Sequence, residues 1–247
     1  MSDTTKRFSE QAGDYRRYRP GYPAAVITLL QKELGFSSGW KVADVGSGTG
    51  LSAELFLNHG NEVWAVEPNP EMREAAEEIY GQQPGFHSVA GTASATGLDQ
   101  DSVHLVCSAQ AFHWFDVEEA KAEFARILQP GGRIVLIWNE RVHDDAFHQA
   151  YEALLYERIE GYREINETKI DRTKIAQLLA PQPLQEQVLD NIQLLDREGL
   201  KGRTRSSSYC PRSGPVYEQL MEELDLLFDR YQENGQLAFR YHTRVFW

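Results

Sequence analysis

The stretch VADVGSGTG, Val42 to Gly50, decides how this chain is expected to fold. Its first residues are β-branched or small and apolar, so they predict a short buried strand. Three glycines follow at alternate positions, and they allow positive φ angles and a close approach of the backbone to a ligand. The next residues, LSAELFLNHG (Leu51 to Gly60), have helical spacing and stop at a glycine. The stretch therefore predicts a strand, a glycine-rich turn and a helix.

The same alternation of strands and helices continues as far as Asn139. Further strands are expected at 62–68, 86–91, 102–110 and 133–139, and helices at 69–81 and 117–132. In the helix 69–81, Asn69 is the candidate N-cap and Pro70 occupies the first turn. Short strands separated by helices of about ten to fifteen residues indicate βαβ units, and hence a parallel sheet with helices on both faces.

Two flanking regions have a different character. Residues 1–23 form a leader that is rich in arginine and tyrosine. The C-terminal part predicts helices near 143–159, at 171–179 and at 215–231, and strands at 186–195 and 236–247. Neither a repeat nor a clear linker interrupts the chain, so one domain over 1–247 is the expectation. We divide it into a lid segment (1–35), a cofactor-binding half (36–140) and an acceptor-side part (141–247).

Composition excludes several classes of protein. The 247 residues are 41% hydrophobic and 25% charged, which is ordinary for a globular protein. A net charge of −12 repels phosphate backbones and argues against a nucleic acid as the main partner. Cys107 and Cys210 are too few for a disulfide framework. The N-terminus has no apolar signal region, and the longest apolar runs are far too short to span a bilayer, so we expect a cytoplasmic protein without a membrane partner.

The spacing of the glycines discriminates between nucleotide sites. A dinucleotide loop, G-x-G-x-x-G, would place its third glycine at position 51, where this chain has leucine. The third glycine here is Gly50, and Asp44 precedes Gly46 by two residues. The spacing D-x-G-x-G-x-G is the form found in the nucleotide loop of methyltransferases that use S-adenosylmethionine.

The resemblance to the class I methyltransferases extends over nearly the whole chain. VADVGSGTG looks like their motif I, AVEPNPEM (65–72) like the end of their second strand, and LQPGGRIVLIWN (128–139) like their proline-glycine turn and fifth strand. A narrower resemblance, to small-molecule enzymes similar to trans-aconitate methyltransferase, rests on FSEQAGDYRRYRPGYP (8–23), AQAFHWFD (109–116), GRTRSSSYCP (202–211) and FRYHTRV (239–245). The family's fold is α/β, a Rossmann-like sheet of seven mostly parallel strands with the last antiparallel. The resemblance implies S-adenosylmethionine as cofactor, S-adenosylhomocysteine as product, and no metal.

The resemblance also assigns roles to residues at the strand ends. Glu67 would accept hydrogen bonds from the two ribose hydroxyls, and Asp44 would hold the amino end of the donor through the loop or a water. Alternatively, Glu67 is an exposed carboxylate before a helix, and Asp44 only braces the turn. The other residues expected around the donor are Gly46, Ser47, Gly48, Gly50, Pro68, Met72, Thr92 and Ala93. Met72 fits the adenine face and a core position equally well.

The segment AQAFHWFD ends the predicted strand 102–110 at the edge where an open α/β sheet binds ligands. Gln110 is the first candidate for lining the region of the transferred methyl group. His113 has three open roles: base for a hydroxyl or amine acceptor, hydrogen-bonding partner in the pocket, or structural residue. Trp114 and Phe112 are expected to form walls of the acceptor pocket, although some rings must pack under the next helix.

Two arginine clusters stand out in this acidic chain. In the leader, Tyr15 is expected to cover the donor and Arg19 to pair with its carboxylate, unless the cluster is only a solvated helix face. The second cluster comprises Lys201, Arg203, Arg205 and Arg212. With Ser206, Ser207 and Tyr209, it predicts an anion-binding wall for a small, carboxylate-bearing acceptor.

The sequence therefore favours a methyltransferase acting on a small molecule, with Gln110 and His113 nearest the chemistry. Two other hypotheses remain: an NAD-type oxidoreductase, which the leucine at position 51 disfavours, and a non-catalytic protein that binds the same nucleotide. Either a monomer or a homodimer is compatible with the sequence.

Overall fold

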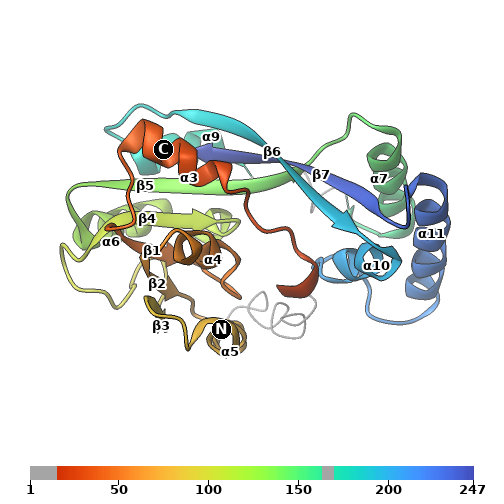
Figure 1. The fold of residues 1–247 in the computed structure, drawn as a ribbon, viewed down its shortest axis with the longest axis horizontal. Helices are drawn as coiled ribbons and strands as arrows, with labels where there is room; N and C mark the ends of the chain where they lie inside the picture. Colours follow the sequence, from red (N-terminus) through yellow and green to blue (C-terminus); the bar gives the residue numbers. More distant parts are fainter. Residues whose placement is uncertain (1–15, 163–169) are drawn as a thin grey trace. The chain divides into compact units, whose positions relative to one another are not determined.

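The computed structural model describes residues 16–162 and 170–247. Within them the strands form one sheet in the order β3-β2-β1-β4-β5-β7-β6 (Figure 1). The first five strands in this order run parallel, and β7 is antiparallel to β5 and β6. The predicted α/β class with an antiparallel last strand is confirmed. The strands are β1 (Lys41–Val45), β2 (Glu62–Val66), β3 (Phe86–Val89), β4 (Val103–Ala109), β5 (Leu128–Arg141), β6 (Glu186–Leu195) and β7 (Leu237–Phe246).

The helices expected from the sequence are all present, with two exceptions to the predicted pattern that have a physical reason. The observed helices are α3 (Ala25–Leu34), α4 (Leu51–Asn58), α5 (Pro70–Tyr80), the 3₁₀ turn η1 (Phe112–Trp114), α6 (Val117–Ile127), α7 (Ala146–Arg158), α9 (Arg172–Leu179), α10 (Arg197–Arg205) and α11 (Pro215–Tyr231). The N-cap of α5 is as predicted, because the Asn69 side chain accepts from the N–H groups of Glu71 and Met72. Helix α10 was not predicted, and its two glycines explain why, since glycine disfavours helix interiors.

The second exception concerns the proline-glycine turn, which was expected to end a helix reaching Gly132. Helix α6 instead ends at Ile127, and β5 begins at Leu128. Leu128 is already extended and pairs with Val103 of β4, after which the register shifts towards Leu105. Pro130 favours an extended conformation for the residue before it, so the segment joins the strand as an irregular start.

The described chain divides into two compact units, and the division falls within β5, β6 and β7. Unit 2 comprises residues 21–139, 170–189 and 243–247, and unit 1 comprises the described residues within 1–20, 140–169 and 190–242. The single domain expected from the sequence, with its lid, cofactor-binding and acceptor-side parts, stays a prediction.

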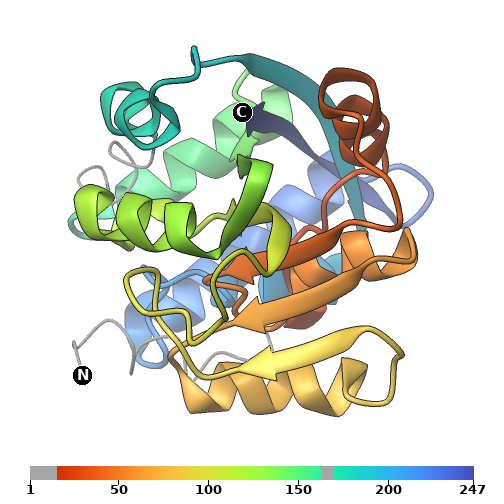
Figure 2. The same ribbon diagram turned by 90° about the vertical axis from the view of Figure 1, so that its left-hand side faces the viewer.

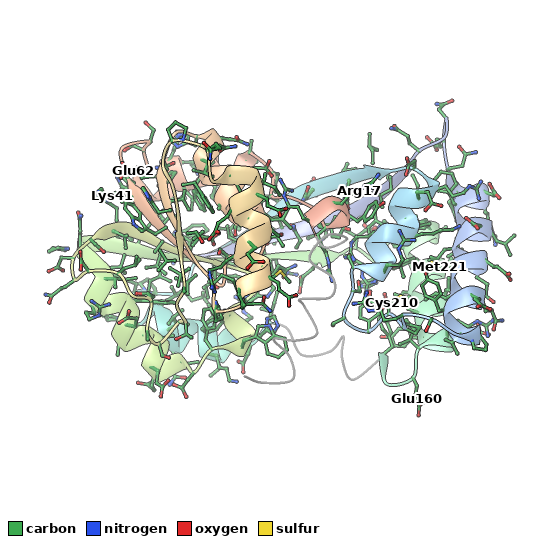
Figure 3. All side chains as sticks on the ribbon, turned by 90° about the horizontal axis from the view of Figure 1, so that it is seen from below. Arg17, Lys41, Glu62, Glu160, Cys210 and Met221 are labelled. Atoms are coloured by element: carbon green, nitrogen blue, oxygen red, sulfur yellow. The ribbon has the colours of Figure 1, made fainter. Side chains whose placement is uncertain are left out.

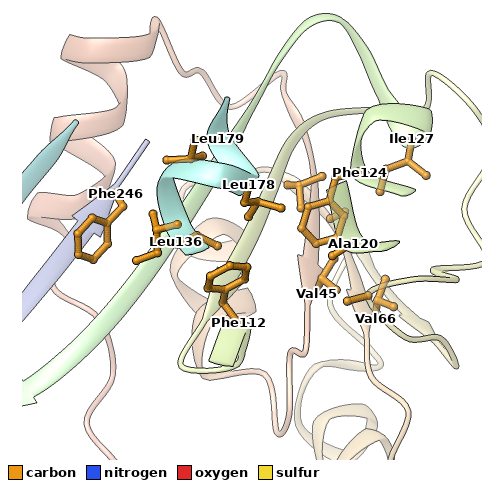
Figure 4. Packing of buried hydrophobic residues seen from close by; sticks show 14 of the residues in the cluster. Val45, Val66, Phe112, Ala120, Phe124, Ile127, Leu136, Leu178, Leu179 and Phe246 are labelled. Atoms are coloured by element: carbon orange, nitrogen blue, oxygen red, sulfur yellow. The ribbon is translucent and has the colours of Figure 1, made fainter. Parts of the chain in front are cut away.

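Unit 2 buries both faces of its parallel strands, as the apolar runs in the sequence require. Alternate residues of each strand enter different core clusters: Val45 and Val106 pack on one face, and Val42 and Leu105 on the other. The first cluster also takes Phe124 of α6, as Figure 4 shows. Figure 2 shows β1, β2, β3 and β4 side by side with α5 along the outer strands. The carboxyl ends of β1 and β2 therefore meet at one edge of the sheet.

Unit 1 is built around helices α7, α10 and α11 (Figure 1). Both α7 and α10 pack against α11. Its core is aromatic: Tyr151, Tyr162, Phe239 and Tyr241 are all nearly inaccessible. Cys210 and Met221, labelled in Figure 3, pack in the same cluster. None of the helices built from residues 16–162 and 170–247 combines the length and the apolar composition that a bilayer crossing requires.

Candidate functional site

The glycine-rich turn between β1 and α4 has three positive φ angles, 73° at Gly46, 55° at Gly48 and 85° at Gly50. A Cβ on Gly46 would lie 2.5 Å from the Cβ of Ala111, and a Cβ on Gly50 would lie 2.7 Å from the Tyr80 ring. Packing therefore requires both outer glycines. At Gly48 the position of a Cβ has no atom of a described residue within 4 Å, so the middle of the turn faces open space. A ligand can approach the backbone there.

The N–H groups of the first three residues of this turn, Gly46 to Gly48, point towards the end of β2 and not outwards. Gly46 and Ser47 donate to the carbonyl of Val66 at 2.8 and 3.2 Å. Gly48 donates to Oε2 of Glu67 at 3.0 Å. A dinucleotide site uses such N–H groups to hold a pyrophosphate. Here they already have acceptors, one of them a carboxylate that would repel a phosphate, so the turn suits a ligand without phosphate.

Glu67 follows β2 directly, and its residue is only 9% exposed. The alternative of an exposed carboxylate is wrong. Oε1 accepts from the N–H of Asn69 at 2.9 Å, and Arg73 donates to the Glu67 carbonyl at 2.8 Å. Burial raises the pKa of Glu67, while the N–H groups of Asn69 and Gly48 and the charge of Arg73 oppose the rise. A carboxylate has about four acceptor positions, and two are used here, so two remain for a pair of hydroxyl groups.

Asp44 lies on β1 and is fully buried. Oδ2 accepts from the Ser52 hydroxyl at 2.6 Å, and this bond ties the carboxyl to the first turn of α4. Oδ1 has no hydrogen-bond partner within the described residues, and the same holds for the buried hydroxyl of Thr49. Burial, with a smaller contribution from the charge of Glu67, raises the pKa of Asp44 to about 7, although the hydrogen bonds from Ser52 and the Ala53 N–H oppose the rise. A buried acceptor without a partner is costly, and bracing the turn through Oδ2 leaves Oδ1 unexplained. The role of Asp44 towards a donor stays a prediction.

The loop after β3, expected near the adenine, is closed by a small bridge. Thr92 and Ala95 exchange two backbone hydrogen bonds, and the exposed Thr92 hydroxyl lies 3.3 Å from that of Ser94. Ala93 is buried at 9% exposure. Glu123 of α6 fixes the far side, because its Oε1 accepts from the Thr96 N–H at 2.8 Å and from its hydroxyl at 2.5 Å. Sequence reasoning missed Glu123, since nothing near it in the chain indicates this partner.

Met72 and Pro68, which were also expected to contact the cofactor, differ in their exposure to solvent. Met72 is 4% exposed in α5, which fits the core alternative. Pro68 is exposed at the turn before Asn69. Their contact with a bound nucleotide stays a prediction.

The segment AQAFHWFD separates into residues with different surroundings. Gln110 has a φ of 60°, which is rare for a residue other than glycine, and its side chain donates to the Asn139 carbonyl at 3.1 Å. Strained backbone of this kind concentrates at functional sites. Because Ala111 contacts the glycine turn at Gly46, Gln110 follows β4 beside that turn.

The rings after Gln110 do not all face solvent. Phe112 is buried and packs edge-on against Trp138, so it belongs to the core in Figure 4 and not to a pocket wall. Trp114 is 58% exposed, and its ring lies 4.5 Å from that of the half-buried His113, measured between centroids. The three roles considered for His113 remain open.

The residues of the second basic cluster have different surroundings, and the anion-binding wall stays a prediction. Lys201 forms an ion pair with Asp225 at 2.7 Å, and Arg212 is exposed. Arg205 is half-buried with its guanidinium over the Tyr18 ring. Arg203 alone is buried, at 5% exposure.

Residues 16–20 of the leader and Tyr209 also belong to unit 1. Arg19 donates to the Ser206 carbonyl at 3.0 Å and lies 3.4 Å from the Ser207 hydroxyl. Its pairing with a donor carboxylate stays a prediction, and Tyr15 lies outside the described residues. Sequence reasoning missed Arg141, Tyr151 and Tyr241, which come from distant segments and surround Arg203 and Tyr209.

Comparison with known proteins identifies the part of the chain that carries this geometry. Residues 43–136 match the family model of a methyltransferase domain. An uncharacterized methyltransferase from Mycobacterium tuberculosis is 38% identical over 139 residues, which are 56% of this chain and 54% of that protein. An uncharacterized methyltransferase-like protein from Schizosaccharomyces pombe is 35% identical over 137 residues, 55% and 52% of the two chains. The chain thus spans about half the length of the curated relatives it matches.

Solved structures resemble the chain over more of its length. A type II methyltransferase candidate from Anaeromyxobacter dehalogenans has a TM-score of 0.67 at 21% identity, covering 92% of this chain and 95% of that one. The YcgJ protein from Bacillus subtilis has a TM-score of 0.54 at 19% identity, covering 89% and 95%. At such identities the likeness shows the fold alone. The narrower resemblance to trans-aconitate methyltransferase stays a prediction.

Proposed function

We propose that this chain, whose residues 43–136 match the family model of a methyltransferase domain, is a class I methyltransferase that transfers a methyl group from S-adenosylmethionine to a small molecule. The observation that carries the proposal is the pair of buried carboxylates at the ends of β1 and β2, on either side of a glycine turn that directs its N–H groups inwards. These features suit a nucleoside that bears hydroxyl and ammonium groups and no phosphate.

In this proposal each carboxylate recognises one part of the donor. Glu67 accepts hydrogen bonds from both ribose hydroxyls at its two remaining positions. Asp44, with Oδ1 lacking a partner within the described chain, accepts from the ammonium end directly or through a water. The open space at Gly48 admits the methionyl part, and the loop at Thr92 and Ala93 lies along the adenine. This arrangement requires no residue that transfers a phosphate group or a hydride.

The chemistry asks little acid–base work of the protein. The bound sulfonium supplies an activated methyl group with a good leaving group. The chain has to hold the acceptor in line and exclude water, and such positioning contributes about 7–11 kcal/mol in favourable cases. Gln110 is held beside the glycine turn by its bond to Asn139, so we assign it to the wall next to the methyl group. If the acceptor is a carboxylate, its oxygen attacks without a base, and His113 is needed only for a hydroxyl or amine acceptor.

Titration calorimetry of the full chain tests the donor assignment. S-adenosylmethionine and S-adenosylhomocysteine should bind and NADH should not. Binding of NADH alone would overturn the proposal in favour of an oxidoreductase. A transfer assay with labelled methyl donor and a panel of small acids, phenols and amines then separates an enzyme from a non-catalytic binder, because a binder transfers no label to any of them.

The affinity for S-adenosylmethionine should rise with pH between about 5.5 and about 7. Burial raises the pKa of Asp44 to about 7 in the free protein, whereas an ammonium group beside it favours the carboxylate. Donor binding therefore releases a proton from Asp44 below pH 7. The affinity for the donor rises with the fraction of Asp44 that is already ionised. The same shift makes the free protein lose stability as pH rises through this window, because the unfolded chain gives up that proton first.

Calorimetry in two buffers with different ionisation enthalpies measures the released proton. Asp44→Asn should bind more weakly and with no pH dependence in this range. Proton uptake on binding, or an affinity that stays flat in the wild-type chain, contradicts the role of Asp44.

A further inference from the structure

Arg203 of α10 is a buried cation whose partners are all uncharged. Its Nε donates to the Tyr241 hydroxyl at 2.8 Å and its Nη1 to the Ser207 hydroxyl at 3.1 Å. The guanidinium also lies over the rings of Phe239 and Tyr241, 5.5 and 5.7 Å from their centroids. Among residues 16–162 and 170–247, no carboxylate lies within ion-pair distance of Arg203. Its third nitrogen, Nη2, has no hydrogen bond to any of these residues.

A buried arginine in this state is unusual. Arginine remains protonated inside proteins, and charged side chains are almost never fully buried without a partner of opposite charge. Uncharged hydroxyls satisfy the N–H groups but leave the charge uncompensated in a medium of low dielectric constant. The site is therefore poised to gain from an added negative charge.

Two more guanidinium groups approach the same place, and with Arg203 they form what we call the guanidinium cluster: Arg19, Arg141 and Arg203. Arg19 and Arg203 converge on one oxygen, that of Ser207, at 3.4 and 3.1 Å. Arg141 donates to the Tyr209 hydroxyl at 3.4 Å and pairs with Glu152 at 3.1 Å. The carboxylate of Glu152 thus compensates Arg141, while the convergence at Ser207 concentrates positive charge around Arg203.

Hydroxyl groups make up the rest of the surroundings of Arg203, and the cluster is partly exposed. Tyr151 exchanges a hydrogen bond with Thr204 at 2.9 Å, on the same helix as Arg203. Tyr209 is only half-buried, so the cluster is not sealed on its side. Hydroxyl donors together with a guanidinium are the groups that bind carboxylate and phosphate oxygens in proteins.

We propose that Arg203 and Tyr209 form the centre of a binding site in unit 1 for the oxyanion of a small molecule, a carboxylate or phosphate group. The anion lies against Nη2 of Arg203 and accepts from the Tyr209 hydroxyl. This inference goes beyond methyl transfer, because it depends only on the charges within unit 1 and holds whether or not the chain is an enzyme.

Tyr209 should compete with the bound anion when it ionises. Burial alone would raise its pKa, but Arg141, Arg203, a hydrogen bond with Ser207 and Arg19 together lower it to about 8. The phenolate can supply the negative charge that the cluster lacks. The other titratable groups around it are Tyr151, Tyr162, Glu152 and Tyr241.

Titration calorimetry of the full chain with succinate and with inorganic phosphate, each at about pH 7, tests the site. The two arms distinguish a carboxylate from a phosphate ligand, and binding of either one supports the site. Arg203→Met should weaken that binding at least about tenfold, because it removes the charge and keeps an apolar stem. The matched control is Arg197→Met, because Arg197 lies on the same helix, its side chain is 41% exposed and its guanidinium pairs with Asp225 and Asp229 on α11. It should bind as the wild type does. No binding of either probe, or equal binding by Arg203→Met, overturns the proposal.

The wild-type chain offers a second readout if Arg203→Met does not fold. Phenolate absorbance should show one tyrosine ionising near pH 8, and Tyr209→Phe should remove it. A saturating concentration of the probe that binds should raise this apparent pKa, because two anions then compete for one guanidinium, and probe affinity should fall above about pH 8 to the same degree. A titration that the bound probe leaves unchanged contradicts the site. The experiment contains no methyl donor, so its failure would leave the proposed function untouched.

Discussion

Glu67→Gln should weaken the binding of S-adenosylmethionine about 100-fold. The carboxylate serves the Gly48 and Asn69 N–H groups at 3.0 and 2.9 Å and, in the proposed function, two ribose hydroxyls as well. Glutamine has one acceptor oxygen in place of two and carries no charge. Each hydrogen bond to a charged group contributes about 1.5–3 kcal/mol, so losing one or two of them corresponds to about two orders of magnitude in affinity.

Calorimetric titration with S-adenosylmethionine, run on both proteins at equal concentration, measures the effect. Glu62→Gln is the matched control, because Glu62 begins the strand that Glu67 follows and its side chain is 53% exposed. Its carboxylate lies 3.9 Å from the ammonium group of Lys41, and both residues are labelled in Figure 3. Its affinity should equal that of the wild type. A Glu67→Gln variant that is folded by circular dichroism and binds within about threefold of the wild type would remove Glu67 from the ribose site.

The convergence of Asp44 and Glu67 could be predicted because it depends on the sheet alone. Both residues stand at the ends of apolar runs, and parallel neighbours present these ends at one edge. The observed register pairs Asp44 with Ala65, two residues before Glu67. The burial of Glu67 could not be predicted, since it depends on the Gly48 and Asn69 N–H groups folding back over it.

Contacts between distant segments escaped prediction. The carboxylate of Glu123 in α6 accepts a hydrogen bond from the N–H of Thr96. The position of Glu123 in a helical sequence pattern does not indicate this partner. The surroundings of Arg203 come from β7, α7 and the end of β5, so their charge balance emerges only after folding. The sequence grouped Lys201 with Arg203, and it could not predict the ion pair between Lys201 and Asp225 of α11 for the same reason.

The aromatic run after β4 shows how a short turn redistributes neighbouring residues. The sequence predicted that some rings of this run pack under the next helix, but it did not show which ones. The 3₁₀ turn η1 sends Phe112 into the core and leaves Trp114 outside, because residues two apart in a helix do not share a face. Only Trp114 therefore remains a candidate for the acceptor pocket, and that role stays a prediction.

Gly46→Ala should lower the free energy of unfolding by about 2–5 kcal/mol, the second large effect we expect. The residue has a φ of 73°, which costs an alanine about 1–2 kcal/mol, and its Cβ would lie 2.5 Å from the Cβ of Ala111, an overpacking worth about 1–3 kcal/mol more. Gly48→Ala is the matched control. Its φ is 55°, but no described atom lies within 4 Å of the new Cβ, so only the conformational cost of about 1–2 kcal/mol applies.

A double mutant separates the two contributions to the Gly46→Ala effect. Ala111→Gly removes the methyl group that the new Cβ meets, so Gly46→Ala with Ala111→Gly should recover the overpacking part and keep the cost of the positive φ. Urea unfolding of the four proteins gives the interaction energy, which should be about 1–3 kcal/mol in favour of the pair. The contrary outcome is a double mutant whose loss of stability equals the sum of the two single losses. In that case the contact between the glycine turn and Ala111 does not explain why position 46 is glycine. Since that contact also sets Gln110 beside the turn, the same result would remove the reason for placing Gln110 next to the transferred methyl group.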